Sequence, residues 1–205
     1  MNNYVITIGR GYGSGGRTIG KMLADKLGIN YYDKEIMRLA SKESGINQQF
    51  FAMADEKLKQ TNIFKVSQNV YRGETFSDVD QISNTELYNY QARVLRELAT
   101  RESFVIMGRC ADFVLKDYKN VTKVFVHASI DKCVKNVSSM SSMTEEELKK
   151  FIMQTDYQRS QYYRFHTGRE WSDARNYDIC LNTDGMTLDN CVETINNYRK
   201  MKGTL

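Results

Sequence analysis

The first 32 residues restrict the fold more than any other part of the chain. Tyr4–Ile8 is a short β-branched run, which is typical of a buried strand. A glycine-rich turn follows, and a helix is predicted beyond it because apolar residues recur at the 3.6-residue period, at Ile19, Met22, Leu23 and Leu27. Ile29–Tyr32 is predicted to be a second strand. Strand, helix and strand in this order form a βαβ unit, which predicts a parallel sheet.

The same alternation continues along the rest of the chain. Further strands are predicted at Phe104–Met107, Val121–His127 and Tyr177–Leu181. Helices are predicted over 34–45, from the capping box Ser83–Glu86, from a second capping box Thr144–Glu147, and from Thr187 onward. Residues 60–82 are mostly polar, and periodicity leaves a helical insertion and disorder both open there. Because neither a repeat nor a linker is visible, the 205 residues predict one α/β domain over residues 1–205.

Charge, hydropathy and cysteine spacing exclude several classes of protein. Lys and Arg number 29 against 25 Asp and Glu, and these charges are interspersed, without the basic run of a nucleic-acid-binding arm. No apolar run approaches the roughly 18 residues of a membrane span, and the N-terminus lacks the features of a signal peptide. The four cysteines share no CxxC spacing and are predicted to be buried. We therefore expect a cytoplasmic protein that binds neither nucleic acid nor membranes.

The segment Gly11–Thr18 (GYGSGGRT) carries the clearest chemical signal. It follows a predicted strand and opens a predicted helix, and it matches the phosphate-binding pattern G-x-x-x-x-G-K-[ST] except that Arg17 replaces lysine. Its four glycines allow positive φ and turn backbone N–H groups inward, and the helix N-terminus adds about half a positive charge. We therefore predict that a nucleotide's phosphates bind to Gly11, Gly13, Ser14, Gly15, Gly16, Arg17 and Thr18.

Two other interpretations of this segment remain open. It could be a glycine-rich turn that only packs between strand and helix. Alternatively, Gly11, Gly13 and Gly16 match the dinucleotide fingerprint G-x-G-x-x-G, which requires an acidic residue about 20 positions later, near the end of the second strand. Asp33 lies close to that position.

Charged residues in two later segments are also candidates for the site. Arg109 and Asp112 follow the third strand, and ligands of parallel sheets bind beyond the carboxyl ends of strands. Asp112 could hold Mg²⁺ through water. Farther along, Asp156 and Arg159 share one side of a helical turn, and Arg159, Arg164 and Arg169 are predicted to share a broad helical face. An arginine-rich helix is often a solvated surface, but beside a phosphate loop it suits phosphoryl transfer, which depends on positioning and charge neutralisation.

These segments resemble the cytidylate-kinase-like family of bacterial proteins. The resemblance is carried by residues 6–36, by VIMGRCADFVL (105–115), by TDYQRSQYYRFHTGREW (155–171) and by NYDICLNTDG (176–185), in the same order. It implies a three-layer P-loop NTPase fold in which helices flank a five-stranded parallel sheet. It also implies a helical acceptor-binding insertion at about 34–98 and a lid at about 141–171.

The resemblance further implies a nucleoside monophosphate kinase that uses ATP with Mg²⁺ and transfers the γ-phosphoryl group to CMP or dCMP. Thr18 of the donor loop would ligate Mg²⁺. The catalytic residues would be Arg17, Arg159 and Arg164, with Arg164 and Arg169 in the lid. The acceptor would be bound by Asp33, Arg109, Asp156 and Arg159.

Three departures from cytidylate kinases leave the acceptor open. Arg17 stands in place of lysine, the lid arginines are not followed by proline, and Ile152 occupies the position of a phosphate-binding arginine. One alternative is a P-loop kinase for a small non-nucleotide acceptor. Another is a nucleotide-binding regulatory protein that has lost the transfer reaction.

Overall fold

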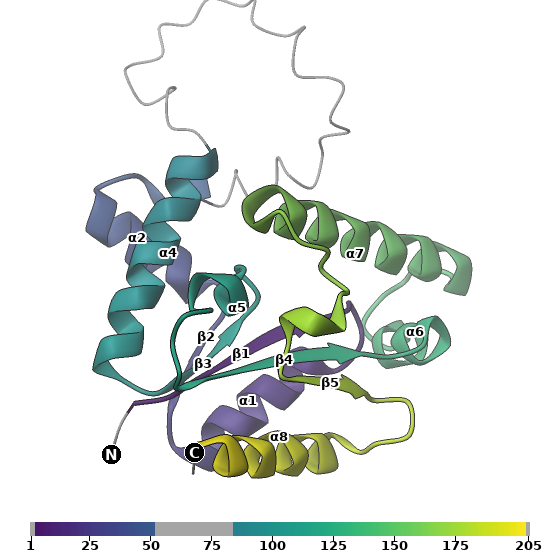
Figure 1. The fold of residues 1–205 in the computed structure, drawn as a ribbon. Helices are drawn as coiled ribbons and strands as arrows, with labels where there is room; N and C mark the ends of the chain where they lie inside the picture. Colours follow the sequence, from purple (N-terminus) through teal and green to yellow (C-terminus); the bar gives the residue numbers. More distant parts are fainter. Residues whose placement is uncertain (1–2, 52–83, 204–205) are drawn as a thin grey trace, which may run out of the picture.

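A computed structural model describes residues 3–51 and 84–203, which form one α/β unit (Figure 1). The strands are β1 (Val5–Arg10), β2 (Asn30–Tyr32), β3 (Phe104–Met107), β4 (Val121–His127) and β5 (Ile179–Asn182). The helices are α1 (Gly16–Leu27), α2 (Glu35–Ser44), α4 (Asn84–Arg101), α5 (Ala111–Val114), α6 (Ile130–Ser138), α7 (Glu145–Thr167) and α8 (Leu188–Gly203), with a 3₁₀ turn η2 (Ala174–Asn176). The predicted capping box at Ser83 and the polar stretch 60–82 lie outside the described residues.

All five strands are parallel and follow the order β2-β3-β1-β4-β5. The predicted fold of a five-stranded parallel sheet flanked by helices is therefore confirmed. In the dinucleotide-binding fold β2 lies next to β1, whereas here β3 separates them, so the dinucleotide interpretation is wrong. The first strand extends beyond its predicted end at Ile8, because Gly9 and Arg10 continue to pair with Phe125 and Val126 of β4.

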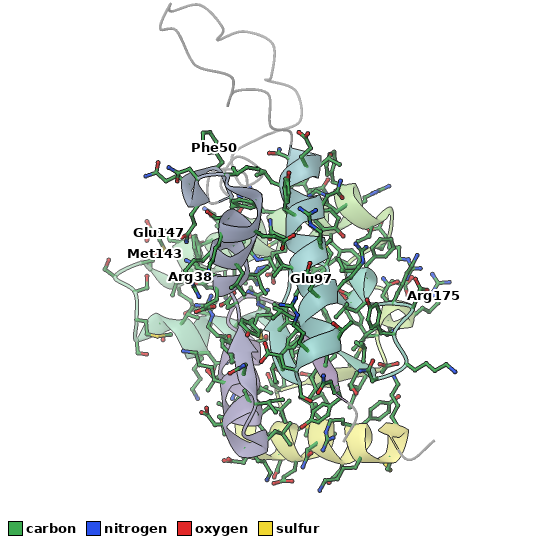
Figure 2. The ribbon with its side chains drawn as sticks, turned by 90° about the vertical axis from the view of Figure 1, so that its left-hand side faces the viewer. Arg38, Phe50, Glu97, Met143, Glu147 and Arg175 are labelled. Atoms are coloured by element: carbon green, nitrogen blue, oxygen red, sulfur yellow. The ribbon has the colours of Figure 1, made fainter. Side chains whose placement is uncertain are left out.

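The two faces of the sheet carry separate apolar cores because successive strand residues point to opposite sides. Val5, Phe104 and Ile106 pack on one face with α2, α4 and α5. Ile6, Val105 and their neighbours pack on the other face with α1 and α8, which lie below the sheet in Figure 1. Figure 2 shows α2 and α4 side by side on the first face. The result is the predicted three-layer arrangement of helices, sheet and helices.

The long helix α7 begins as predicted. The Thr144 side chain accepts from the Glu147 amide, and the Glu147 side chain accepts from the Thr144 amide, which completes the capping box. A third apolar cluster joins α7 to α6 and includes Leu148 and Ile152. Among the described helices, none is long and apolar enough to cross a membrane.

The prediction of buried cysteines is correct at three positions and wrong at Cys180. Cys180 lies on β5, which pairs only with β4 and forms an edge of the sheet. Its side chain points away from the core that its neighbour Leu181 enters, because adjacent residues of a strand alternate between faces.

Candidate active site

The glycine loop connects the central strand β1 to α1, and its conformation requires glycine. Gly13 and Gly15 have φ of 78° and 85°, in the left-handed region that other residues rarely adopt. A Cβ on Gly13 would lie 2.8 Å from the carbonyl oxygen of Cys133 in α6. The loop therefore passes α6 at backbone distance, where no side chain fits.

Residues from three distant segments hold the loop in this shape. The Tyr12 amide donates to Asp156 Oδ1 at 2.8 Å, Asn136 Nδ2 donates to the Gly13 carbonyl at 2.8 Å, and Thr183 Oγ1 donates to the Ser14 carbonyl at 3.0 Å. Within the described part of the chain, the amides of Gly13, Gly15 and Arg17 donate to no protein acceptor. Unpaired N–H groups on a preorganised loop at a helix N-terminus are suited to an anion such as phosphate.

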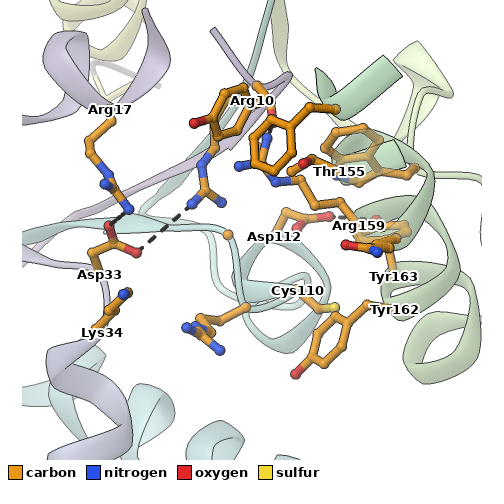
Figure 3. Close-up of a pocket in the computed structure, with 17 residues that line it drawn as sticks. Arg10, Arg17, Asp33, Lys34, Cys110, Asp112, Thr155, Arg159, Tyr162 and Tyr163 are labelled. Carbon is orange, nitrogen blue, oxygen red and sulfur yellow. Dashed lines mark hydrogen bonds and ion pairs between the residues drawn. The ribbon is translucent and has the colours of Figure 1, made fainter. Parts of the chain in front are cut away.

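A cavity of about 430 Å³ opens beside this loop (Figure 3). Its walls come from the carboxyl ends of β1, β2 and β3 and from α7. The charged groups that line it are Arg10, Arg17, Asp33, Lys34, Arg109, Asp112 and Arg159. Aromatic rings complete the lining, namely Tyr12, Phe151, Tyr162, Tyr163 and Trp171. The cavity therefore combines cations with flat apolar surfaces.

Positive charge exceeds negative charge in this cavity. Asp33 is shared by two arginines, with an Arg17 Nη2 to Oδ2 distance of 2.7 Å and an Arg10 Nη2 to Oδ1 distance of 3.9 Å. The pKa of Arg10 is lowered to about 10, chiefly by burial. Among the nearby cations, Arg159 contributes most to this lowering. Arg10 is still protonated at neutral pH. The cavity is therefore suited to an anionic ligand.

The turn after β3 places Arg109 at the cavity. Arg109 and the following Cys110 have φ of 61° and 52°, which is uncommon for residues other than glycine. Such backbone conformations persist where the surrounding structure enforces them, and they cluster at functional sites. The prediction that Arg109 faces the end of the sheet where ligands bind agrees with its place in the cavity lining.

Asp112 lies at the same turn and also lines the cavity. Its Oδ2 accepts a hydrogen bond from the Tyr163 hydroxyl at 2.6 Å, which joins α5 to α7. Burial raises the pKa of Asp112, and this disfavours the ionised carboxylate that binds Mg²⁺. Asp112 therefore links α5 to α7 in the cavity wall.

Besides Asp112, four of the predicted site residues meet at this cavity: Arg17, Asp33, Arg109 and Arg159. Asp156 does not line the cavity. Its Oδ1 accepts from the Tyr12 amide and from Arg159 Nη1, the latter at 3.0 Å, so its carboxylate holds the glycine loop. Arg159 Nη1 also donates to the Arg10 carbonyl at 3.0 Å. Burial raises the pKa of Asp156, although Arg159 acts in the opposite direction.

The predicted arginine face of α7 is wrong. Five residues turn an α-helix by about 500°, so residues at this spacing point about 140° apart. The exposed Arg164 pairs with Glu170 at 3.2 Å and does not line the cavity. Arg169 lies beyond the helix, which ends at Gly168, and it donates to Asn176 Oδ1 at 3.4 Å.

The sequence analysis missed several lining residues, of which Arg10 and Lys34 matter most. Both lie at the carboxyl ends of strands, where Arg109 was found. Arg10 was missed because the first strand was predicted to end at Ile8. Thr155, Gln158 and Tyr162 recur every three to four residues around Arg159. This helical spacing would have identified the face of α7 that lines the cavity.

The strand order and the glycine loop together define a P-loop α/β fold. A family model described as the cytidylate kinase-like family matches residues 5–185, and the chain belongs to this family. A protein named cytidylate kinase from Sulfurisphaera tokodaii is 20% identical over 195 residues, which cover 95% of this chain and 94% of that protein.

Solved structures support the same fold. An uncharacterized protein from Eubacterium ventriosum has a TM-score of 0.70 and 26% identity, covering 97% of this chain and 99% of its own. A shikimate kinase from Bacteroides thetaiotaomicron has a TM-score of 0.54 and 14% identity, covering 96% and 98%. A gluconokinase from Sinorhizobium meliloti has a TM-score of 0.52 and 13% identity, covering 98% and 93%. At these identities the two kinases are similar in fold alone.

Proposed function

We propose that this protein is an ATP-dependent phosphotransferase that moves the γ-phosphoryl group of ATP to a nucleoside monophosphate, with CMP or dCMP as the first candidates. The observation that carries the proposal is the position of a cation-rich cavity directly beside the glycine loop, with Arg17 common to both. The family and the similarity to a protein named cytidylate kinase support this choice of acceptor.

In this proposal the glycine loop holds the donor. The amides of Gly13, Gly15 and Arg17 bind phosphate oxygens, and the Arg17 guanidinium leaves Asp33 to neutralise the transferred group. The exposed Thr18 hydroxyl in the first turn of α1 is the loop group suited to hold the Mg²⁺ that accompanies ATP, since such ions take few protein ligands. Mg²⁺, when bound, supplies charge neutralisation of the phosphates.

The cavity holds the acceptor. Arg109 and Arg159 bind its phosphate, and the Tyr12, Tyr162 and Trp171 rings offer surfaces for a flat base. An oxygen of this phosphate forms a bond to the γ-phosphorus while the bond to the β-phosphate oxygen breaks and ADP leaves. The attacking oxygen is already ionised, so no catalytic base is needed. The segments 34–98 and 141–171 act as acceptor-binding insertion and lid.

One observation favours a second candidate, a kinase for a small non-nucleotide acceptor. By resemblance, Asp156 would contact a cytosine base, but here its carboxylate holds the Tyr12 amide and Arg159. With Asp156 directed at the loop, the cavity presents Asp33 and Lys34 to the acceptor instead. These groups suit hydroxyl-bearing or anionic metabolites.

A coupled ADP-release assay with ATP and Mg²⁺ distinguishes these candidates. The acceptors are CMP, dCMP, UMP, AMP and GMP, followed by a panel of small phosphorylated and hydroxylated metabolites. We expect turnover with CMP or dCMP that Arg17→Ala abolishes and that Arg101→Ala, at an exposed arginine of α4, leaves unchanged. Turnover only with a metabolite favours the second candidate. Activity that survives Arg17→Ala contradicts the donor assignment.

A further inference from the structure

Arg10 has an unusual environment for a buried cation. It is the last residue of the central strand, and its side chain is only 17% exposed. Among the described residues its guanidinium makes no hydrogen bond, and its only ion pair is the 3.9 Å approach to Asp33. A guanidinium has five N–H donors, and leaving buried donors unpaired costs free energy. Figure 3 shows this group projecting into the cavity beside Asp33.

The surrounding residues make room for the Arg10 guanidinium without neutralising it. A Cβ on Gly108 would overlap Arg10 Nη1, and one on Gly16 would lie 2.6 Å from Arg10 Cβ. Gly108 also has a φ of 64°. Asp33, the nearest carboxylate, is already engaged by Arg17 at 2.7 Å. Two glycines therefore accommodate an arginine whose donors face the cavity.

On the opposite wall of the cavity, α7 contributes Arg159 but carries no arginine at position 152. Ile152 occupies the position where the resemblance places a phosphate-binding arginine. Its side chain is buried between α6 and α7, against Val134 and Leu148, and does not line the cavity. Arg159, about two turns farther along α7, has its Nη1 engaged by Asp156 and by the Arg10 carbonyl. The free donors closest to the end of β1 are therefore those of Arg10.

We propose that Arg10 binds the phosphate of the acceptor from the floor of the cavity and thereby takes the place of the arginine that Ile152 replaces. This inference rests on the proposed function for the identity of the acceptor, whereas the ligand class, a phosphate group, rests on Arg10 itself. The planar guanidinium offers two parallel N–H donors to two phosphate oxygens. Binding a phosphate supplies the acceptors that the guanidinium lacks. Arg10 is thus a residue that selects phosphorylated acceptors over neutral ones.

Calorimetry on three variants tests this inference. The glycine loop is first saturated with a non-hydrolysable ATP analogue and Mg²⁺, so that added CMP or inorganic phosphate reports on the cavity. Arg10→Met removes the charge while keeping an extended side chain, and Arg10→Lys keeps the charge but not the planar fork. Arg101→Met is the matched control, because Arg101 is an exposed arginine at the end of α4. Thermal unfolding confirms that each variant is folded.

We expect Arg10→Met to weaken the binding of CMP and of inorganic phosphate at least tenfold. Arg10→Lys should have an intermediate effect on both affinities, and Arg101→Met should have none. The affinity for the ATP analogue should change less than twofold in all three. If the affinity for the ATP analogue fell as much as the affinity for CMP, Arg10 would belong to the donor site and the inference would be overturned. Unchanged CMP and phosphate binding in a folded Arg10→Lys or Arg10→Met protein, or a wild-type cavity that binds neither probe, would overturn it as well.

Failure of the proposed function gives a different pattern. If the wild-type protein binds phosphate in an Arg10-dependent manner but does not bind CMP or phosphorylate it, the inference about Arg10 holds and the nucleotide acceptor is wrong. If the protein phosphorylates CMP while Arg10→Met binds CMP as tightly as wild type, the function holds and the inference about Arg10 is wrong.

Discussion

The Asp156 carboxylate offers the sharpest test of how the site is organised, because sequence and structure assign it different roles. By resemblance it contacts the acceptor, whereas in the structure it holds the glycine loop through the Tyr12 amide at 2.8 Å and Arg159 at 3.0 Å. Substitution should therefore impair donor binding and stability. It should leave the preference among acceptors unchanged.

The structure also sets the expected magnitudes. Asp156→Ala removes two charge-assisted hydrogen bonds and leaves both donors unpaired in a site where the Asp156 side chain is 29% exposed, so we expect a loss of about 2–3 kcal/mol in unfolding free energy. Asp156→Asn keeps an acceptor for Tyr12 but loses the charge that faces Arg159, at a cost of about 1 kcal/mol. In these variants ATP has to reorder the loop when it binds, which lowers its affinity. A reordering free energy of about 1.4 kcal/mol corresponds to tenfold weaker binding.

The measurements are urea denaturation and calorimetric titration with a non-hydrolysable ATP analogue. Asp131→Asn is the control, because Asp131 is 80% exposed and its ion pair with Lys149 lies at the surface, where such pairs contribute little. We expect both the unfolding free energy and the affinity for the analogue to decrease in the order wild type, Asp156→Asn, Asp156→Ala. The reasoning is refuted if both Asp156 variants bind the analogue normally while their relative activity toward CMP and UMP changes.

Three further predictions concern the glycine loop and two groups whose pKa is shifted by burial, Asp112 and His166. Gly13→Ala and Gly28→Ala both place alanine at positive φ, which should lower the unfolding free energy by about 1–2 kcal/mol in each variant. Only at Gly13 does the new Cβ meet backbone atoms, so calorimetry should show loss of binding of the ATP analogue in Gly13→Ala alone. Burial raises the pKa of Asp112 above its usual 3.8, so its contribution to stability is complete below that pH and is lost as the pH rises through the folded value. Urea denaturation from pH 4 to 8 should show Asp112→Asn gaining stability relative to wild type, and a constant difference would contradict this. His166 stacks on Tyr88 with ring centroids 4.1 Å apart, and burial lowers its pKa to about 4, so its contribution is complete above pH 6.5 and is lost as the pH falls toward 4. His166→Phe should therefore reduce the acid sensitivity of thermal unfolding between pH 7 and 4, and an unchanged pH profile would exclude His166 as its source.

Local patterns predicted most of the fold. Phe104–Met107 and Val121–His127 were predicted with their observed bounds, because buried parallel strands are continuous apolar runs with clear boundaries. The fifth strand begins at Ile179, two residues later than predicted, because the 3₁₀ turn Ala174–Asn176 and the residues after it precede β5. The extension of β1 to Arg10 depends on pairing with β4, which no local pattern reveals.

The site was predicted where motif and topology suffice, and missed where distant segments meet. Arg17 and Arg109 follow from the glycine pattern and from the rule that ligands bind at strand ends. The contact of Asp156 with the Tyr12 amide joins residues 144 positions apart, and its direction depends on how α7 packs against the loop. Arg164 was misplaced because spacing alone was considered and the rotation of the helix was not.

Direct observation of phosphoryl transfer from ATP to CMP tests the central claim most directly. Purified protein is incubated with ATP, Mg²⁺ and CMP, and phosphorus NMR follows the β-phosphate signals of ADP and CDP. Our account predicts that both diphosphates appear in equal amounts and that neither appears with Arg17→Ala. ATP that stays unchanged beside CMP, in a sample where calorimetry shows both ligands bound, would contradict it.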